Sequence, residues 1–421
     1  MNKAPDHKIL IPISKIEDAA KRLSKVVLES PLQRNAGLSE KYNCNIFLKR
    51  EDLQTVRSFK IRGAYNKMLC LSESELSKGV ICASAGNHAQ GVAFACSQLK
   101  VKGTIVMPNP TPDQKIKKVK QFGGEWIEII MNGDNFDEAQ EQAFAEAKKS
   151  NKVFIHPFDD EEVAAGQGTI GLEIIAQMDG DLDYLLVAVG GGGLIAGVSS
   201  YFNKLSPNTK IIAVEAAGAS KLSASLKAGK NVRLQGVDNF ADGISVKEMG
   251  ARNFFICQQT VDQSVTVPEG KIATSILDLY NEEAIVVEPA GAVSVAALGL
   301  LRKEIEGKNV GIIVCGGNND INRTQEIQER SMLYEGLKHY FIIKFPQRAG
   351  ALRDFLNVLG PTDDITHFQY TKKNNKENGP ALVGIELTKV EDFDELVLKM
   401  NAESINFRHL NDDPTLFETM V

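Results

Sequence analysis

The chain has 421 residues, more than one ordinary hydrophobic core accommodates, so two or three folding units are expected. It carries 48 basic and 54 acidic residues, for a net charge of −6, and has no long basic run, which argues against nucleic acid and anionic membranes as partners. Its six cysteines include no CxxC pair and its six histidines no HxxxH pair, so we expect reduced thiols in a cytoplasmic protein and no transition-metal site. No stretch approaches the length of an apolar membrane span, so no membrane segment is expected.

Short apolar runs alternate with helical patterns between about residues 45 and 320. Strand-like runs include 153–156, 185–189, 211–215, 284–288 and 310–317, and helical patterns include 135–150 and 271–280. Such alternation indicates parallel strands joined by helical crossovers, and hence an α/β architecture.

The first unusual segment is TVRSFKIRGA, residues 55–64, which contains Lys60 between Arg57 and Arg62. Desolvation by the apolar neighbours and repulsion from the two arginines disfavour another ammonium, so part of the amine is expected to be neutral. A neutral amine is the nucleophile that forms a Schiff base with an aldehyde. The alternative is a surface lysine at the basic start of a helix.

A second segment, SAGNH at residues 84–88, follows the strand-like run 80–83 and precedes the helical pattern 89–99. A strand that ends in a small-residue turn and opens a helix presents unpaired backbone N–H groups to an anion. Asn87 adds a side-chain amide to that site. The alternative is a plain turn at the Gly-Asn pair.

A third segment, GGGGL at residues 190–194, lies between a strand-like run and a helical pattern. Glycines let the backbone approach a ligand without a Cβ in the way, and at a strand-to-helix junction the natural ligand is a phosphate. A flexible linker does not fit, because apolar runs flank the segment on both sides.

The same glycines also satisfy a loose dinucleotide fingerprint, with Gly191, Gly193 and Ala196 at the expected spacing and Glu215 at the end of the next strand. An NAD-binding dehydrogenase is therefore an alternative. It gives no role to Lys60 or to the asparagine loop.

A reactive amine, an anion-binding loop and a phosphate cradle together predict an aldehyde that carries a phosphate, which is pyridoxal 5'-phosphate. The segments SFKxRGA, SAGNHAQG, GGGGL and VEPAGA (residues 287–292) resemble those of the tryptophan-synthase-β-like, fold type II pyridoxal-phosphate enzymes. Among these the chain is similar to the biosynthetic threonine dehydratases, over nearly its whole length. The resemblance implies a catalytic domain at residues 1–330, with a small subdomain of about 56–154 inserted in a larger one and the cofactor in the cleft between them.

The resemblance also implies a role for each matching residue. Lys60 holds the cofactor and removes the α-proton of the substrate, and with Ser84 it forms the expected catalytic pair. Phe59 packs beside the cofactor ring, Gly243 leaves room over its other face, and Asn87 binds its 3-oxygen. The expected phosphate cradle is Gly190, Gly191, Gly192, Gly193 and Leu194. The expected substrate-carboxylate loop is Ser84, Ala85, Gly86, Asn87 and His88. Glu288 is a candidate for a supporting role behind these residues.

Two positions refine the expected chemistry. Cys315 stands where the family places a serine or threonine hydroxyl against the pyridine nitrogen, and it is a weaker, neutral partner. A neutral partner leaves the cofactor a weaker electron sink, which favours β-elimination over transamination. The alternative for Cys315 is a small buried apolar side chain. Ala85 stands where related racemases carry a serine hydroxyl, so racemisation is not expected.

The chain changes character after about residue 320. A charged segment ends in an expected linker at 331–337, and residues 338–421 form a separate unit. Its pattern comprises strands at 339–346, 364–373 and 380–389, helices at 351–360 and 391–404, and a turn at 373–380. This β-α-β-β-α order is typical of a ferredoxin-like α+β unit.

The segment FPQRAGAL, residues 345–352, resembles the start of the ACT-like regulatory domains, here in one copy. The resemblance implies dehydration and deamination of L-threonine to 2-oxobutanoate and ammonia, the first step of isoleucine biosynthesis. It also implies a homotetramer inhibited by isoleucine, with valine as a candidate competitor. Two alternatives stay open: a serine-preferring dehydratase, because one methyl group is discriminated only modestly, and a C-terminal unit that serves oligomerisation.

Overall fold

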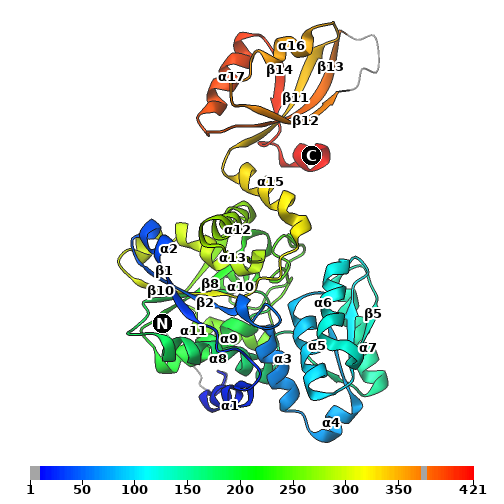
Figure 1. Ribbon diagram of the computed structural model, residues 1–421, viewed down its shortest axis with the longest axis vertical. Helices are drawn as coiled ribbons and strands as arrows, with labels where there is room; N and C mark the ends of the chain where they lie inside the picture. The colour runs from blue at the N-terminus through cyan, green and yellow to red at the C-terminus, as the bar shows by residue number, and fades with distance from the viewer. Residues whose placement is uncertain (1–9, 371–376) are drawn as a thin grey trace. The chain divides into compact units, whose positions relative to one another are not determined.

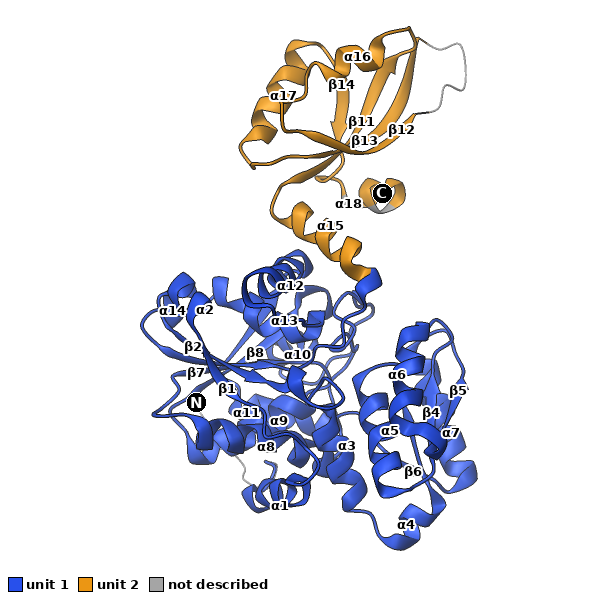
Figure 2. Ribbon diagram, in the orientation of Figure 1, with its two compact units in different colours: residues 1–322 blue, residues 323–421 orange. Residues whose placement is uncertain are grey.

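A computed structural model of the protein describes residues 10–370 and 377–421. The chain divides into two compact units, residues 1–322 and 323–421 (Figure 2). The division precedes the helix α15 (Thr324–Tyr334), which therefore belongs with the second unit. Within the described residues, no helix combines the length and the apolar character needed to cross a membrane.

The first unit is built around a six-stranded sheet whose strand order is β1-β2-β10-β7-β8-β9. All neighbouring strands run parallel except the pair β1 and β2. The strands are β1 (Leu32–Asn35), β2 (Asn45–Arg50), β7 (Tyr184–Ala188), β8 (Lys210–Ala216), β9 (Gln263–Val267) and β10 (Asn309–Val314). The central strands are almost wholly buried because helices cover both faces.

Helices α8, α9 and α11 lie on one side of this sheet and α12 and α13 on the other (Figure 1). The helices of this part are α1 (Ile13–Leu23), α2 (Ala36–Tyr42), α8 (Glu161–Gln177), α9 (Gly193–Leu205), α10 (Lys221–Ala228), α11 (Ala251–Thr260), α12 (Glu269–Glu283), α13 (Pro289–Ala296) and α14 (Arg302–Ile305). The α/β architecture predicted from the alternating pattern is confirmed.

A second, smaller parallel sheet in the same unit has the strand order β5-β4-β3-β6. Its strands are β3 (Val80–Ala83), β4 (Gly103–Met107), β5 (Ile127–Met131) and β6 (Val153–Phe154). Its helices are α4 (Glu73–Lys78), α5 (Asn87–Leu99), α6 (Asp113–Gly123) and α7 (Phe136–Ser150), and α3 (Lys60–Leu69) leads into it from the large sheet. These elements lie in the chain between β2 and β7, within the range for which an inserted subdomain is expected.

The strand predicted at residues 284–288 is wrong. Ala284 takes a left-handed conformation, with φ of 52°, and ends α12. Glu288 then stands directly before α13, which begins at Pro289. The segment is a connection between two helices. Its apolar residues misled the prediction because some of them, such as Val287, are buried without belonging to a sheet.

The second unit is a four-stranded antiparallel sheet with the order β12-β13-β11-β14. Its elements are β11 (Lys338–Pro346), α16 (Ala351–Leu356), β12 (Asp364–Tyr370), β13 (Asn378–Glu386), α17 (Asp392–Ala402), β14 (Asn406–His409) and α18 (Pro414–Met420). The predicted ferredoxin-like order is confirmed. The predicted turn at 373–380 lies largely outside the described residues. Strand β14 and helix α18 were not predicted; β14 is four residues long and none of them is fully buried, so it carries little signal.

Candidate active site

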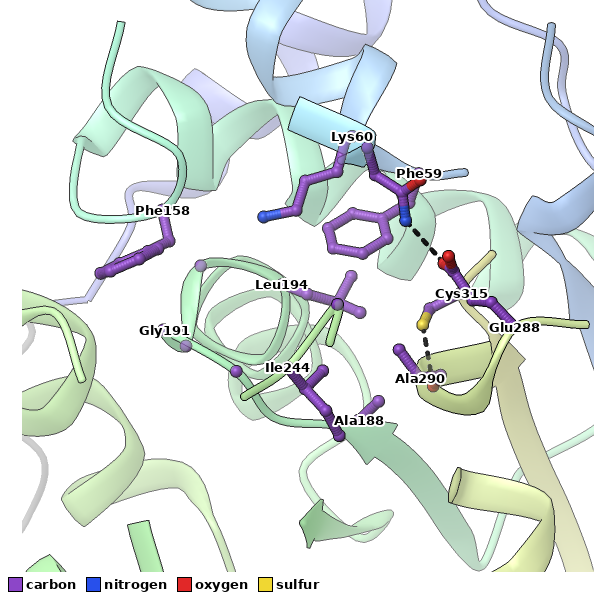
Figure 3. Close-up of a pocket in the computed structure, with 15 residues that line it drawn as sticks. Phe59, Lys60, Phe158, Ala188, Gly191, Leu194, Ile244, Glu288, Ala290 and Cys315 are labelled. Atoms are coloured by element: carbon purple, nitrogen blue, oxygen red, sulfur yellow. Dashed lines mark hydrogen bonds between the residues drawn. The ribbon is translucent and has the colours of Figure 1, made fainter. Parts of the chain in front are cut away.

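The predicted cofactor residues come from separate parts of the chain and line one cavity of about 450 Å³ (Figure 3). The cavity lies where β7 and β10 end side by side in the large sheet. The chain continues from β7 to β8, which is the neighbour of β7 on the side away from β10. The other neighbour of β10 is β2. A crevice therefore opens at the carboxyl ends of β7 and β10. The predicted residues that line it are Phe59, Lys60, Asn87, Gly190, Gly191, Gly192, Gly193, Leu194, Gly243 and Cys315.

Lys60 is the first residue of α3, and its side chain points into this cavity (Figure 3). Its Nζ donates a hydrogen bond to the Pro157 carbonyl at 2.9 Å and lies 5.3 Å from the centre of the Phe59 ring. Burial lowers the pKa of Lys60 to about 8, although Cys315 and Glu288 act in the opposite direction. The prediction of a partly neutral amine is thus supported by its environment.

Two causes were predicted for the lowered pKa of Lys60, and of these, repulsion from the flanking arginines is wrong. The Arg62 guanidinium is buried in an ion-pair cluster, where it donates to Glu51 at 2.8 Å and to Glu173. Arg57 is exposed. Desolvation, and not a neighbouring positive charge, is therefore what favours the neutral amine of Lys60.

The glycine loop joins β7 to α9 and has no room for side chains. A Cβ on Gly191 would lie 2.2 Å from the Phe158 ring, and a Cβ on Gly192, whose φ is +90°, would lie 2.4 Å from Met249 Cε. The Gly191 carbonyl accepts hydrogen bonds from Asn253 Nδ2 at 2.9 Å and from the Gly250 amide at 3.0 Å. The loop is therefore held in one shape at the start of a helix, where unpaired backbone amides are suited to an anion.

Residues 84–88 lead from β3 into α5 and line a second cavity of about 1060 Å³. Lys60, Asn87 and Glu288 line both cavities, so the amine is accessible from both. The Gly86 amide donates to Ser84 Oγ at 3.2 Å, which shapes the turn. This arrangement brings the predicted carboxylate loop next to the predicted amine.

The His88 imidazole is held in the interior, with Nε2 2.9 Å from the Ile155 carbonyl. Burial lowers the pKa of His88 to about 3, so the ring is neutral near pH 7. The neutral ring, with one nitrogen hydrogen-bonded to a carbonyl, supports the turn. It offers no positive charge to a substrate carboxylate. The expected carboxylate contact would therefore have to come from the backbone amides of the loop.

Asn87 is held by the side chains of Asn318 and Glu288. No role was predicted for Asn318, and only a supporting role was predicted for Glu288. Asn318 Nδ2 donates to Asn87 Oδ1 at 2.7 Å, and Asn87 Nδ2 donates to Glu288 Oε1 at 2.6 Å. Burial, and then the charge of Asp242, raises the pKa of Glu288 to about 7. Asn318 follows β10 in the large sheet, whereas Asn87 follows β3 in the small one, so no pattern within one segment of the sequence could have revealed their contact.

Cys315 follows β10 and is 3% exposed, with its Sγ donating to the Ala290 carbonyl at 3.1 Å (Figure 3). The Phe59 amide donates to the Cys315 carbonyl at 3.1 Å, which ties the residue before Lys60 to the end of β10. Burial raises the pKa of the Cys315 thiol, so the sulfur stays protonated and neutral. The sequence prediction of a neutral group here is consistent with this environment.

The residues present fit pyridoxal phosphate. The cavity offers an amine, a glycine cradle whose Cβ positions are closed, a neutral thiol and a carboxamide. No group of three or more histidine, cysteine or acidic side chains suited to a metal ion occurs among residues 10–370 and 377–421.

The nicotinamide alternative fails at Glu215, which it requires to bind a ribose. The Glu215 carboxylate has no exposed surface and accepts hydrogen bonds from the amides of Leu222 and Ser223, both at 2.8 Å. It stabilises the start of α10 and is closed to a dinucleotide.

Comparisons with known proteins agree with this geometry. Residues 23–316 match the pyridoxal-phosphate-dependent enzyme family, and residues 329–420 match the C-terminal regulatory domain of threonine dehydratase. The chain is 54% identical to the biosynthetic L-threonine dehydratase IlvA of Bacillus subtilis over 413 residues, 98% of each chain.

Two solved structures are also similar. Threonine deaminase isoform 2 of Solanum lycopersicum matches with a TM-score of 0.74 and 41% identity, covering 78% of this chain and 95% of its own. Serine racemase of Dictyostelium discoideum matches with a TM-score of 0.68 and 32% identity, covering 74% of this chain and 99% of its own. The chain belongs to the biosynthetic L-threonine dehydratases, within the pyridoxal-phosphate-dependent enzyme family.

Proposed function

We propose that this protein converts L-threonine to 2-oxobutanoate and ammonia, with Lys60 as the base. The observation that carries the proposal is the desolvated amine of Lys60, which lines both the cavity of the glycine cradle and the cavity of the loop 84–88. Bound pyridoxal phosphate supplies an electron sink that weakens the bond to the α-hydrogen of an attached amino acid. Its phosphate would be held by residues 190–194 and its ring by Phe59, Asn87, Gly243 and Cys315.

The protein's own groups accept the α-proton and orient the substrate. With a pKa of about 8, the Lys60 amine is partly neutral near neutral pH and can accept the α-proton. The backbone amides of residues 84–88 hold the substrate carboxylate and so aim the α-hydrogen at Lys60 Nζ. Asn318 orients the carboxamide of Asn87 toward the ring. Ser84 is kept as a catalytic candidate of this loop.

The neutral thiol of Cys315 favours elimination over transamination. A carboxylate at this position would stabilise a protonated ring nitrogen and a long-lived carbanion, whereas a neutral group does not. Loss of the β-hydroxyl then competes well with other fates of the substrate. Ala85 carries no acid or base for the opposite face of the substrate, so racemisation has no proton donor at this position.

Substrate preference is tested by comparing threonine with serine. The two substrates differ by one methyl group. A fitted apolar pocket changes kcat/KM by roughly 10- to 200-fold for such a difference. We expect kcat/KM for 2-oxobutanoate formation from L-threonine to exceed that for pyruvate formation from L-serine by about this range. A ratio below one would favour the serine-preferring dehydratase. Appearance of the D-enantiomer of either substrate would contradict the role given to Ala85.

The second unit is proposed to bind isoleucine as a feedback effector, and valine is proposed to compete with isoleucine for the same site. The protein is proposed to be a homotetramer in the cytoplasm. The domain division proposed is a catalytic part at 1–330, a linker at 331–337 and an ACT-like part at 338–421. The match of residues 329–420 to a regulatory domain supports an effector function. A charged helix, α15, precedes the sheet of this unit, and the catalytic cavity is complete without either of them.

Isoleucine is expected to raise the threonine concentration that gives half-maximal rate. Allosteric coupling of about 1–3 kcal/mol corresponds to a roughly 5- to 150-fold change in affinity, and it is reciprocal. Rates are measured over a range of threonine concentrations with and without isoleucine, and isoleucine binding is measured with and without a substrate analogue. A chain shortened after Arg330, where the proposed catalytic part ends, serves as the unresponsive control. A full-length enzyme that ignores isoleucine at every threonine concentration would favour the oligomerisation alternative.

A further inference from the structure

Lys221, the first residue of α10, is a buried cation with an unusual set of partners. Its side chain has no exposed surface. Its Nζ donates to the main-chain carbonyls of Val189 at 2.5 Å, Ala219 at 3.1 Å and Ile244 at 3.1 Å. The Glu215 carboxylate lies 3.3 Å from the same nitrogen.

The partners require the charged form of this amine. An ammonium has three N–H donors and a neutral amine has two, so only the ammonium can satisfy all three carbonyls at once. Burial lowers the pKa of Lys221, and the charge of Glu215 opposes that effect. The nitrogen is thus enclosed by three carbonyl oxygens and one carboxylate, which are the ligands that replace the hydration shell of a bound metal cation.

The three carbonyls belong to segments that shape the cofactor cavity. Val189 directly precedes the glycine loop, and Ile244 directly follows Gly243 and itself lines the cavity. The two segments touch, because a Cβ on Gly190 would lie 3.1 Å from Ile244 Cα. Ala219 ends the short helix η3 (Ala217–Ala219) that connects β8 to α10. One ammonium therefore ties the phosphate cradle, the Gly243 segment and the end of β8 together.

We propose that Lys221 is a built-in cation, a positioning residue whose ammonium supplies the charge that a bound monovalent cation would otherwise supply and so holds the phosphate cradle in its binding geometry. Lys221 lines neither catalytic cavity, so this function acts through the loops. It goes beyond the proposed reaction and would hold for any substrate of this site.

The first consequence concerns the unmodified protein. Its dissociation constant for pyridoxal phosphate and its melting temperature are expected to be the same in potassium, sodium or tetramethylammonium chloride at equal ionic strength. The cofactor constant is measured by equilibrium dialysis and does not depend on turnover. A cofactor affinity that rises with potassium but not with tetramethylammonium would overturn the proposal, because the cation position would then not be filled by Lys221.

The second consequence concerns Lys221→Ala. This change removes the ammonium and leaves the three carbonyl oxygens and the Glu215 carboxylate around it, which together form an oxygen cage. In tetramethylammonium chloride the cofactor dissociation constant of this variant is expected to rise about 10- to 100-fold, as for the loss of charged hydrogen bonds. Ammonium or potassium ions, which fit the cage, are expected to restore most of that loss. Lys227→Ala on the same helix is the matched control, since Lys227 is exposed, and should behave as the unmodified protein in every salt.

Each other outcome decides against the proposal. A Lys221→Ala protein that binds the cofactor normally in tetramethylammonium chloride would show that the cradle does not need the charge. Lost affinity that neither ammonium nor potassium restores would assign Lys221 to general stability. If the alanine variant does not fold in any salt, Lys221→Met keeps the apolar stem without the charge. Normal cofactor affinity in that variant overturns the proposal. Weakened affinity with an unchanged melting temperature of the cofactor-free protein supports it, and weakened affinity with a lowered melting temperature assigns Lys221 to general stability.

Discussion

Replacing Lys60 with alanine is expected to abolish 2-oxobutanoate formation while leaving the fold intact. Loss of a positioned general base alone costs about 10²–10⁴-fold in rate. Lys60→Ala also removes the amine that attaches the cofactor, so the total loss is expected to be larger. The side chain makes one hydrogen bond, to the Pro157 carbonyl, so the melting temperature of the protein without cofactor should change little.

The site of attachment is tested separately from the rate. Borohydride reduction of the protein with its cofactor, followed by peptide mapping, should label Lys60 alone. Lys78→Ala is the matched control, because Lys78 is exposed at the end of α4 and should leave both the labelling and the rate unchanged. A label on any other lysine would remove the basis of the proposed reaction, whatever the activity of the alanine variant.

The amine of Lys60 illustrates what a local pattern can and cannot predict. An apolar setting around a lysine is visible in the sequence, and desolvation does lower its pKa. The two flanking arginines suggest repulsion as well, but Arg62 is paired with Glu51 and with Glu173, which lies 111 residues away along the chain. An ion pair between such distant residues leaves no mark on the segment around Lys60, so its cancelling effect could not be predicted.

The same distinction holds for the rest of the site. The glycine loop and the asparagine loop were predictable because each is a strand, a turn and a helix start in consecutive residues. Asn318 was not, because its contact with Asn87 depends on two sheets meeting. Lys221 was not either, since its partners come from three separate segments. The error at residues 284–288 has the converse cause, because burial between helices produces the same apolar run as a strand.

Replacing Cys315 with aspartate is expected to damage elimination strongly and to raise side reactions, above all transamination. The carboxylate would stand against the ring nitrogen and favour its protonated state, which strengthens the electron sink and prolongs the carbanion. Cys315→Ser keeps a neutral group of similar size, so elimination should be retained. The measurements are the rate of 2-oxobutanoate formation, the yield of aminated cofactor and the visible absorption spectrum.

Cys315→Ala separates the ring-nitrogen function from simple packing. If Cys315 is only a small buried apolar side chain, alanine should leave kinetics and spectrum unchanged, and so should aspartate once it is protonated. If the thiol contacts the ring nitrogen, alanine should alter the spectrum of the bound cofactor even where the rate survives. Unchanged kinetics and spectra in both variants would place Cys315 away from the ring.

The pH dependence of stability in Cys315→Asp gives a further test that does not depend on turnover. The new carboxyl would be buried close to Glu288, and both effects raise its pKa in the folded protein above the unfolded value of about 3.9. An acid whose folded pKa is raised destabilises the fold as the pH rises above its unfolded pKa. Without cofactor, the variant should therefore lose melting temperature relative to the unmodified protein between about pH 4 and pH 8. A bound ring nitrogen that carries a proton pairs with the carboxylate and should restore much of that loss, whereas a carboxylate remote from the ring would gain nothing specific from the cofactor.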